Sequence, residues 1–257
     1  MSLWRPAFLL TRRALVQFPR MPALLVFSLV PPIVQFLIFG SIFGNLPDEL
    51  PDFPTDNYHE YIAPAVVFFT TVIGIANAGI ALATDFRTGY FQKVMLAPVN
   101  MWALLLGRLL SDGVRVYLQA GFILLLALGF GARVETGIVG ALLMLAMATL
   151  FALTTVGVLV ANIALKTKSE QSTQAIFPIF FILIFLTTAF LPEERIGSDV
   201  VKAIIRVNPA EYIVSPMQGL MMTGYEWGEI GLAFGIIGAF AVLGVLLTRL
   251  NYRSVYK

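Results

Sequence analysis

Apolar residues run in long blocks along the chain, and short polar segments separate them. Six blocks are long enough to cross a membrane, near residues Ala23–Phe43, Tyr61–Ala83, Val114–Phe130, Ile138–Leu165, Ala175–Leu191 and Gly228–Leu250. A helix needs about 20 mostly apolar residues to cross a hydrocarbon core of roughly 30 Å, because its backbone polar groups must be satisfied within the helix. The pattern predicts an all-α integral membrane protein with six transmembrane helices.

Composition agrees with this prediction. Of the 257 residues, 58% are hydrophobic and 12% are charged, whereas a soluble domain is about 25% charged. The chain has no cysteine, which excludes disulfides and thiolate metal sites. It contains no internal repeat or long linker, so residues 1–257 are expected to form a single transmembrane domain.

The charged residues predict an orientation, because Lys and Arg accumulate on the cytoplasmic side of membrane proteins. With the N-terminus inside, 13 of the 17 Lys and Arg fall in cytoplasmic segments, and only Arg133, Arg195, Lys202 and Arg206 lie outside. Of the 15 acids, only Asp85, Asp112 and Glu170 lie inside. We therefore expect a multi-pass protein of the cell (inner) membrane with both termini in the cytoplasm. The net charge of +2 gives no reason to expect a nucleic-acid partner.

Three further helical segments are expected outside the spans. In residues 1–20, Trp4, Phe8, Leu15 and Phe18 fall on one helical stripe, typical of a helix that lies in the headgroup region; an ordinary positively charged anchor is the alternative. Residues 192–227 are too short to span but contain two apolar segments, which predict short re-entrant helices on the outer side. Pro178 predicts a kink in the fifth span.

Enzymatic chemistry finds little support in the sequence. The chain contains no GxxxxGK[ST], HExxH or GxSxG motif, so neither catalytic residues nor a bound cofactor is expected. His59 is the only histidine. It could serve a metal or a proton, but without a second imidazole or thiol we expect a solvated loop residue and no metal site.

One charged group falls at the start of the third span. Arg108, Asp112 and Arg115 are spaced i, i+4 and i+7, which places them on one helical face. Because an unpaired charge inside a bilayer is costly, we expect a structural ion cluster at the cytoplasmic boundary. A proton relay is the alternative.

A second polar segment, residues 84–100, lies between the second and third spans. An apolar stripe at helical spacing contains Phe86, Tyr90 and Val94, and Arg87 and Lys93 lie outside it. Amphipathicity alone is also typical of a helix that merely connects two spans. The alternative is a cytoplasmic helix with one face on the membrane-embedded body and the other on a partner.

Four stretches together resemble the membrane subunits of ATP-binding-cassette (ABC) exporters of the type-2 class, and within that class the daunorubicin-resistance-type drug exporters. They are "TDFRTGYFQKVMLAPVNMWALLLGRLLSDGVRV", "EYIAPAVVFF", "FLTTAFLPEERI" and "VNPAEYIVSPMQGLM", and they match the family in the same order along the chain. Two departures stand out. Thr187, Thr188 and Ala189 replace the usual Ser-Gly, and Gln218 replaces the usual Arg.

The resemblance implies a permease without its own ATPase motif, which exports an amphiphilic drug-like or lipid-like substrate. It also implies a homodimer that binds two copies of a separate ABC ATPase, where ATP and Mg are held. Residues 84–100 then become a coupling helix that contacts the ATPase through Asp85, Phe86, Arg87, Gly89, Tyr90, Phe91 and Lys93. The alternatives are a secondary transporter, which should display buried coupling-ion groups, and a non-transporting membrane scaffold.

Overall fold

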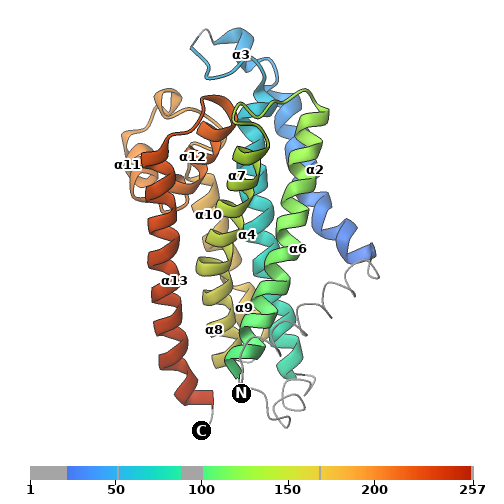
Figure 1. The fold of residues 1–257 in the computed structure, drawn as a ribbon, viewed down its shortest axis with the longest axis vertical. Helices are drawn as coiled ribbons and strands as arrows, with labels where there is room; N and C mark the ends of the chain where they lie inside the picture. The colour runs from blue at the N-terminus through green and yellow to red at the C-terminus, as the bar shows by residue number, and fades with distance from the viewer. Residues whose placement is uncertain (1–21, 51, 88–100, 168, 256–257) are drawn as a thin grey trace.

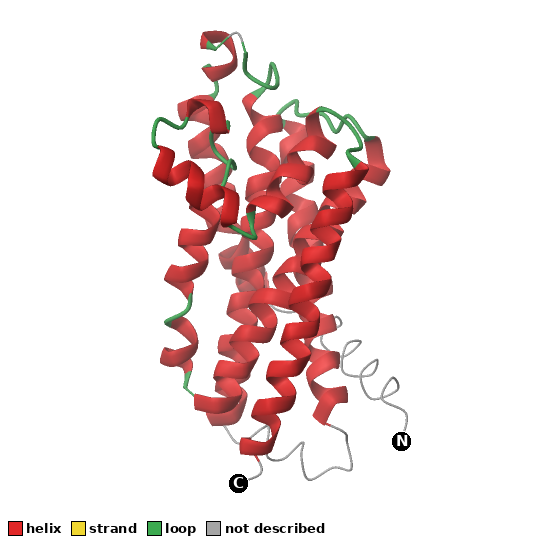
Figure 2. Ribbon diagram, turned by 90° about the vertical axis from the view of Figure 1, so that its left-hand side faces the viewer, coloured by secondary structure: helices red, strands yellow, loops and turns green. Residues whose placement is uncertain are grey.

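The computed structural model describes residues 22–50, 52–87, 101–167 and 169–255, and every regular element in these ranges is a helix (Figure 1, Figure 2). The long helices lie side by side along the long axis of the molecule. In chain order the elements are α2 (Pro22–Phe43), α3 (Leu46–Glu49), α4 (Tyr58–Arg87), α6 (Met101–Gly129), α7 (Gly137–Phe151), η2 (Ala152–Gly157), α8 (Val158–Thr167), α9 (Glu170–Gln174), α10 (Phe177–Phe185), η3 (Glu193–Arg195), α11 (Asp199–Val207), α12 (Glu211–Met222) and α13 (Trp227–Val255).

Five helices of the described part are long and apolar enough to cross a membrane. Their spans are Ser28–Glu49, Tyr58–Asn77, Leu106–Gly129, Gly137–Ala164 and Trp227–Leu250. They match five of the six predicted blocks. In an 18-residue window of each span, only 17% of the residues of the first and 22% of those of the last are buried within the chain, so α2 and α13 leave most of their apolar side chains for lipid or another protein.

The remaining predicted span, Ala175–Leu191, is not one long helix. Its apolar residues form α10, which follows the short helix α9 and ends at Phe185. Pro178 lies in the first turn of α10, where its missing N–H prevents α9 from continuing through it. At the other end, the side-chain amide of Asn208 donates to the carbonyls of Leu183 (2.7 Å) and Leu186, and so satisfies acceptors that the helix end leaves open. A sixth membrane crossing therefore stays a prediction.

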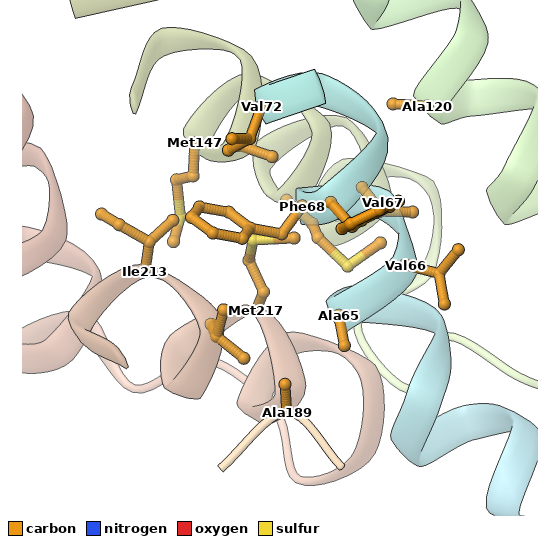
Figure 3. Close-up of a cluster of buried hydrophobic side chains, with 14 of the residues drawn as sticks. Ala65, Val66, Val67, Phe68, Val72, Ala120, Met147, Ala189, Ile213 and Met217 are labelled. Carbon is orange, nitrogen blue, oxygen red and sulfur yellow. The ribbon is translucent and has the colours of Figure 1, made fainter. Parts of the chain in front are cut away.

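Helix α4 lies at the centre of the molecule. In an 18-residue window of its span Tyr58–Asn77, 83% of the residues are buried, and α4 contacts α2, α6, α7, α8, α9 and α12. Figure 3 shows Phe68 of α4 packed among Met147 of α7 and Ile213 and Met217 of α12. All four side chains are almost completely buried. This apolar core joins the central helix to the upper part of the bundle, as Figure 1 orients it.

The fourth predicted span consists of α7, η2 and α8 in direct succession. The middle part, Ala152–Gly157, is a π-helix, whose wider turns are rare and usually confined to one short insertion in an α-helix. The halves on either side of η2 share the neighbours α4 and α13, but only α7 packs closely on α12 and only α8 packs closely on α9.

Two helices, α11 and α12, occupy the segment predicted to be re-entrant. The apolar side chains of α11 form one wide stripe along the helix, in which Ile205 is buried while Val200 and Val207 are 69% and 78% exposed. How deep these helices lie in the membrane stays a prediction. The expected interfacial helix at residues 1–20 and most of the expected coupling helix at 84–100 lie outside the described residues.

Candidate functional site

The charged group on α6 lies in the lower half of the bundle, close to α4. Oδ1 of Asp112 is 3.4 Å from the Arg115 guanidinium, and Oδ2 is 3.8 Å from that of Arg108. Arg115 also donates to the backbone carbonyl of Gly74 in α4 at 3.1 Å. The three side chains are 18–29% exposed, so the group is partly buried. Its structural role stays a prediction.

The same face of α6 continues upward with a polar residue. Gln119 follows Arg115 by four positions, is buried, and donates from Nε2 to the hydroxyl of Ser28 in α2. Arg108, Asp112, Arg115 and Gln119 therefore form one row along the helix, which we call the α6 polar row. It meets α4 at Gly74 and α2 at Ser28.

Gly74 permits the close approach of α4 and α6 beside this row. A Cβ atom at position 74 would lie 2.5 Å from Cγ1 of Val116, a distance at which the helices would have to separate. Val116 is fully buried and cannot swing into open space. The missing side chain thus brings the Gly74 carbonyl within reach of Arg115.

The predicted ATPase contacts fall mostly outside the described residues. Asp85, Phe86 and Arg87 form the last turn of α4, where the structure describes the backbone only, and Gly89, Tyr90, Phe91 and Lys93 lie beyond it. Figure 1 shows α4 ending and α6 beginning at the lower end of the molecule. The segment that joins them is therefore anchored at that end on both sides.

Basic and acidic residues lie at opposite ends of the long axis of the molecule. Lys166 in the last turn of α8 and Arg249 in α13 belong to the lower end, where the C-terminus also lies (Figure 1). The segments at the upper end carry acids: Asp48, Glu49, Glu60, Glu135, Glu193, Glu194, Asp199, Glu211, Glu226 and Glu229. The described part of the chain is thus basic below and acidic above.

A hydrogen-bonded network at the upper end joins three of the four stretches that carried the family resemblance. Thr188, after α10, donates to the Glu211 carboxylate of α12 from its backbone N–H (2.7 Å) and its hydroxyl (2.6 Å). The hydroxyl of Tyr61 in α4 donates to the Thr188 carbonyl at 2.6 Å. We call Tyr61, Thr188, Glu211 and Gln218 the upper network.

The two departures from the family pattern meet in this network. Nε2 of Gln218 lies 3.4 Å from the carbonyls of both Thr188 and Tyr61, and its Oε1 lies 3.5 Å from the Thr188 hydroxyl. An amide can donate and accept at once. Gln218 is therefore suited to bridge α4 and the loop after α10.

Glu211 is the one acid of this network, and burial raises its pKa above the ordinary value, although the hydrogen bonds from Thr188 act in the opposite direction. Neither Glu211 nor Thr188 was singled out as a site residue from the sequence. The available signal was an acid next to a proline turn in an otherwise apolar segment. Linear spacing could not indicate that Thr188, 23 residues earlier, would be its partner.

His59 does not lie in a solvated loop, as was expected, but in the first turn of α4. Its ring packs against Phe36 and Phe130, with centroids 5.2 and 5.3 Å away. Nδ1 lies 3.1 Å from the side-chain oxygen of Asn57. The described residues include no group of three or more His, Asp or Glu side chains that could hold a metal ion.

Comparison with known proteins places these features in a family. A family model described as ABC-2 type transporter matches residues 6–222. The chain is 24% identical over 242 residues to the daunorubicin resistance ABC transporter permease protein DrrB1 of Streptomyces coeruleorubidus, covering 92% of this chain and 83% of that one. It is 24% identical over 239 residues to the inner membrane transport permease YadH of Escherichia coli K12, covering 86% and 85% of the two chains.

Proposed function

The chain belongs to the ABC-2 type transporter family, and we propose that it is the permease subunit of an ABC exporter driven by a separate ATPase. It would move an amphiphilic, drug-like or lipid-like molecule out of the cytoplasm or the inner leaflet. The relatives named above are transport permeases, and the chain itself contains no nucleotide-binding motif.

One observation of the structure carries the proposal. Helix α4 ends at Arg87 and α6 begins at Met101, at the same end of the molecule as Lys166 and Arg249 (Figure 1). By the positive-inside rule this lower end faces the cytoplasm. The segment 88–100 then lies on the cytoplasmic side, where an ATPase could contact it, and both termini are cytoplasmic.

The assembly follows from the transport role. A two-fold homodimer would form a pathway between paired subunits, and two ATPase copies would bind beneath it, with ATP and Mg in the ATPase only. The mostly exposed helices α2 and α13 offer apolar surface for a second copy or for lipid. The relative YadH is named an inner membrane protein, and we propose the same membrane here.

Coupling requires that the ATPase grip the permease differently with and without ATP, because a contact equal in both states shifts no equilibrium. Tyr90 and Phe91 would supply the packed anchor of this contact, and Asp85, Arg87 and Lys93 would set its register at the rim. Gly89 would allow the chain to turn between α4 and the anchor.

The test replaces Tyr90 and Phe91 together by Ala in the permease–ATPase complex. ATP-driven transport of a fluorescent amphiphile into inverted vesicles should be lost, while membrane insertion persists. The matched control replaces Tyr225 and Trp227, an aromatic pair stacked 5.2 Å apart at the upper end, and should keep most transport. Wild-type transport by the Tyr90–Phe91 variant would mean that the segment only connects two helices.

A further inference from the structure

The α6 polar row extends into the part of α6 that is expected to cross the membrane. The span covers Leu106–Gly129, and Arg115 and Gln119 lie well inside it. At about 1.5 Å per residue, the row from Arg108 to Gln119 is roughly 16 Å long, about half of a hydrocarbon core of roughly 30 Å. Ionisable groups at such depth are expensive and commonly mark a substrate path.

We propose that the α6 polar row binds the anionic headgroup of the transported amphiphile, with Arg115 as its deepest positive contact. This inference rests on the proposed function, since it assumes an amphiphile that enters from the lower, cytoplasmic side. The headgroup would be a phosphate, sulfate or carboxylate, and its apolar tail would remain among the lipids.

The charges of the row favour an anion. Two guanidinium groups, those of Arg108 and Arg115, flank the single carboxylate of Asp112. Only two other acids, Asp85 and Glu170, belong to the basic end of the chain. The ion pairs with Asp112 fix both guanidinium groups on one face of α6, while 28% and 29% of the Arg108 and Arg115 side chains remain exposed. An incoming headgroup can therefore reach them.

One buried polar atom of the row lacks a partner. Nε of Arg115 is buried without a hydrogen-bond partner. Buried polar groups are almost always satisfied, so this atom indicates that an additional polar group enters beside Arg115. Both amide atoms of Gln35 in α2 are also buried without a partner, but Gln35 lies two turns above Ser28, next to Phe36, whose ring packs on Phe130 just beyond the upper end of α6, so it is not part of the row.

The guanidinium groups of the row favour an oxyanion as the ligand. Arg presents a planar set of N–H donors that matches phosphate and carboxylate oxygens in pairs. Helix α2 contacts the top of the row at Ser28, but only 17% of an 18-residue window of its span is buried, and its first turns stand apart from α6 in Figure 1. The lower part of the row is therefore not covered by α2.

The test measures binding of two short-chain fluorescent lipids to the purified permease–ATPase complex in neutral detergent. The anionic probe is phosphatidylglycerol and the zwitterionic probe is phosphatidylcholine. Arg115→Gln should weaken binding of the anionic probe by at least about tenfold, the loss expected for one charge-assisted contact, and leave the zwitterionic probe within about twofold. Arg115→Lys should retain part of the anionic binding because it keeps the charge.

Gln119→Leu keeps all charges and provides a second variant if Arg115→Gln does not assemble. It should weaken binding of the anionic probe more than binding of the zwitterionic probe. An equal loss of both probes in either variant would show a structural role only and overturn the proposal, as would unchanged binding of the anionic probe. Full competition by millimolar inorganic phosphate would also overturn it, because the site would then read a free anion rather than an amphiphile.

The same experiments distinguish failure of the binding site from failure of the proposed export function. A wild-type complex that binds the anionic probe through Arg115 but moves no amphiphile on ATP hydrolysis would refute export and leave the binding site in place. A complex that exports amphiphiles equally well with Arg115→Gln, and binds both probes unchanged, would refute the binding site alone.

Discussion

The strongest link in the upper network is the contact between Thr188 and Glu211, and Thr188→Val removes half of it. Valine keeps the shape of threonine but lacks the hydroxyl that donates to Glu211 Oε1 at 2.6 Å. The backbone N–H of residue 188 still faces Oε2 at 2.7 Å. The substitution therefore loosens the loop after α10 without removing side-chain volume from the core.

The size of the effect follows from the geometry. Both bonds are short and reach a carboxylate, and hydrogen bonds to charged groups contribute about 1.5–3 kcal/mol each. Leaving one carboxylate oxygen of a largely buried Glu211 without its donor adds a desolvation cost. Local opening of the loop should thus become easier by about 1.5–3 kcal/mol, which corresponds to roughly a 10- to 100-fold larger open population.

Hydrogen exchange at pH 8, followed by mass spectrometry of the peptide that contains Thr188, measures this opening directly, since the Thr188 N–H is itself one of the two donors. Exchange there should quicken by roughly 10- to 100-fold in Thr188→Val. Thr188→Ser retains the hydroxyl and should exchange nearly as the wild type. Wild-type exchange in a folded Thr188→Val protein would refute the idea that Glu211 holds this loop.

Three further predictions concern helix packing, pH and topology. Gly74→Ala should lower the free energy of unfolding by about 1–3 kcal/mol through overpacking against Val116. Thermal unfolding should show that adding Val116→Ala restores part of this stability. An unchanged melting temperature in Gly74→Ala alone would contradict the close approach of α4 and α6. Burial raises the pKa of Glu211, so its protonated form contributes stability that is complete below the ordinary value of 4.5 and is lost as pH rises through the raised pKa. Melting temperatures should therefore fall with rising pH in this range, and Glu211→Gln should remove the fall. The same fall in Glu211→Gln would mean that another group causes it. Because the natural chain has no cysteine, single cysteines at Arg195 and Lys166 can be labelled in intact cells with a membrane-impermeant reagent, and only the former should react.

Hydropathy predicted the five long helices because a helix that crosses lipid needs a continuous run of apolar residues, and such a run can be recognised within a short stretch of sequence. The same measure predicted one long helix at Ala175–Leu191, and this was wrong, because the helix there, α10, ends at Phe185. Hydropathy counts apolar side chains, whereas helix length also depends on backbone partners. Asn208 supplies such partners to Leu183 and Leu186, and it comes from a part of the chain more than 20 residues away.

In the candidate site, too, some features could be predicted from local sequence and others could not. The spacing of Arg108, Asp112 and Arg115 follows from helical periodicity, so their placement on one face could be anticipated. The contact of Arg115 with Gly74 depends on how two helices cross, which no local pattern encodes. Glu211 was missed for a related reason, because its importance lies in a partner that only the tertiary fold supplies.

The two ends of the molecule communicate through few elements. The upper network involves α4, α12 and the loop after α10, while the α6 polar row involves α2, α4 and α6. Helix α4 belongs to both, since Tyr61 lies in the network and Gly74 beside the row. A second path of helices runs from α8 through η2 to α7, which packs on α12, and α13 contacts both α8 and α12 as well. The π-helical turn at η2 interrupts the α-helical hydrogen-bond pattern of this second path, and the buried hydroxyl of Thr155 within it has no hydrogen-bond partner. Helix α4 also has a break in its backbone pattern, because Pro64 lies inside it and lacks the N–H that would bond to the preceding turn.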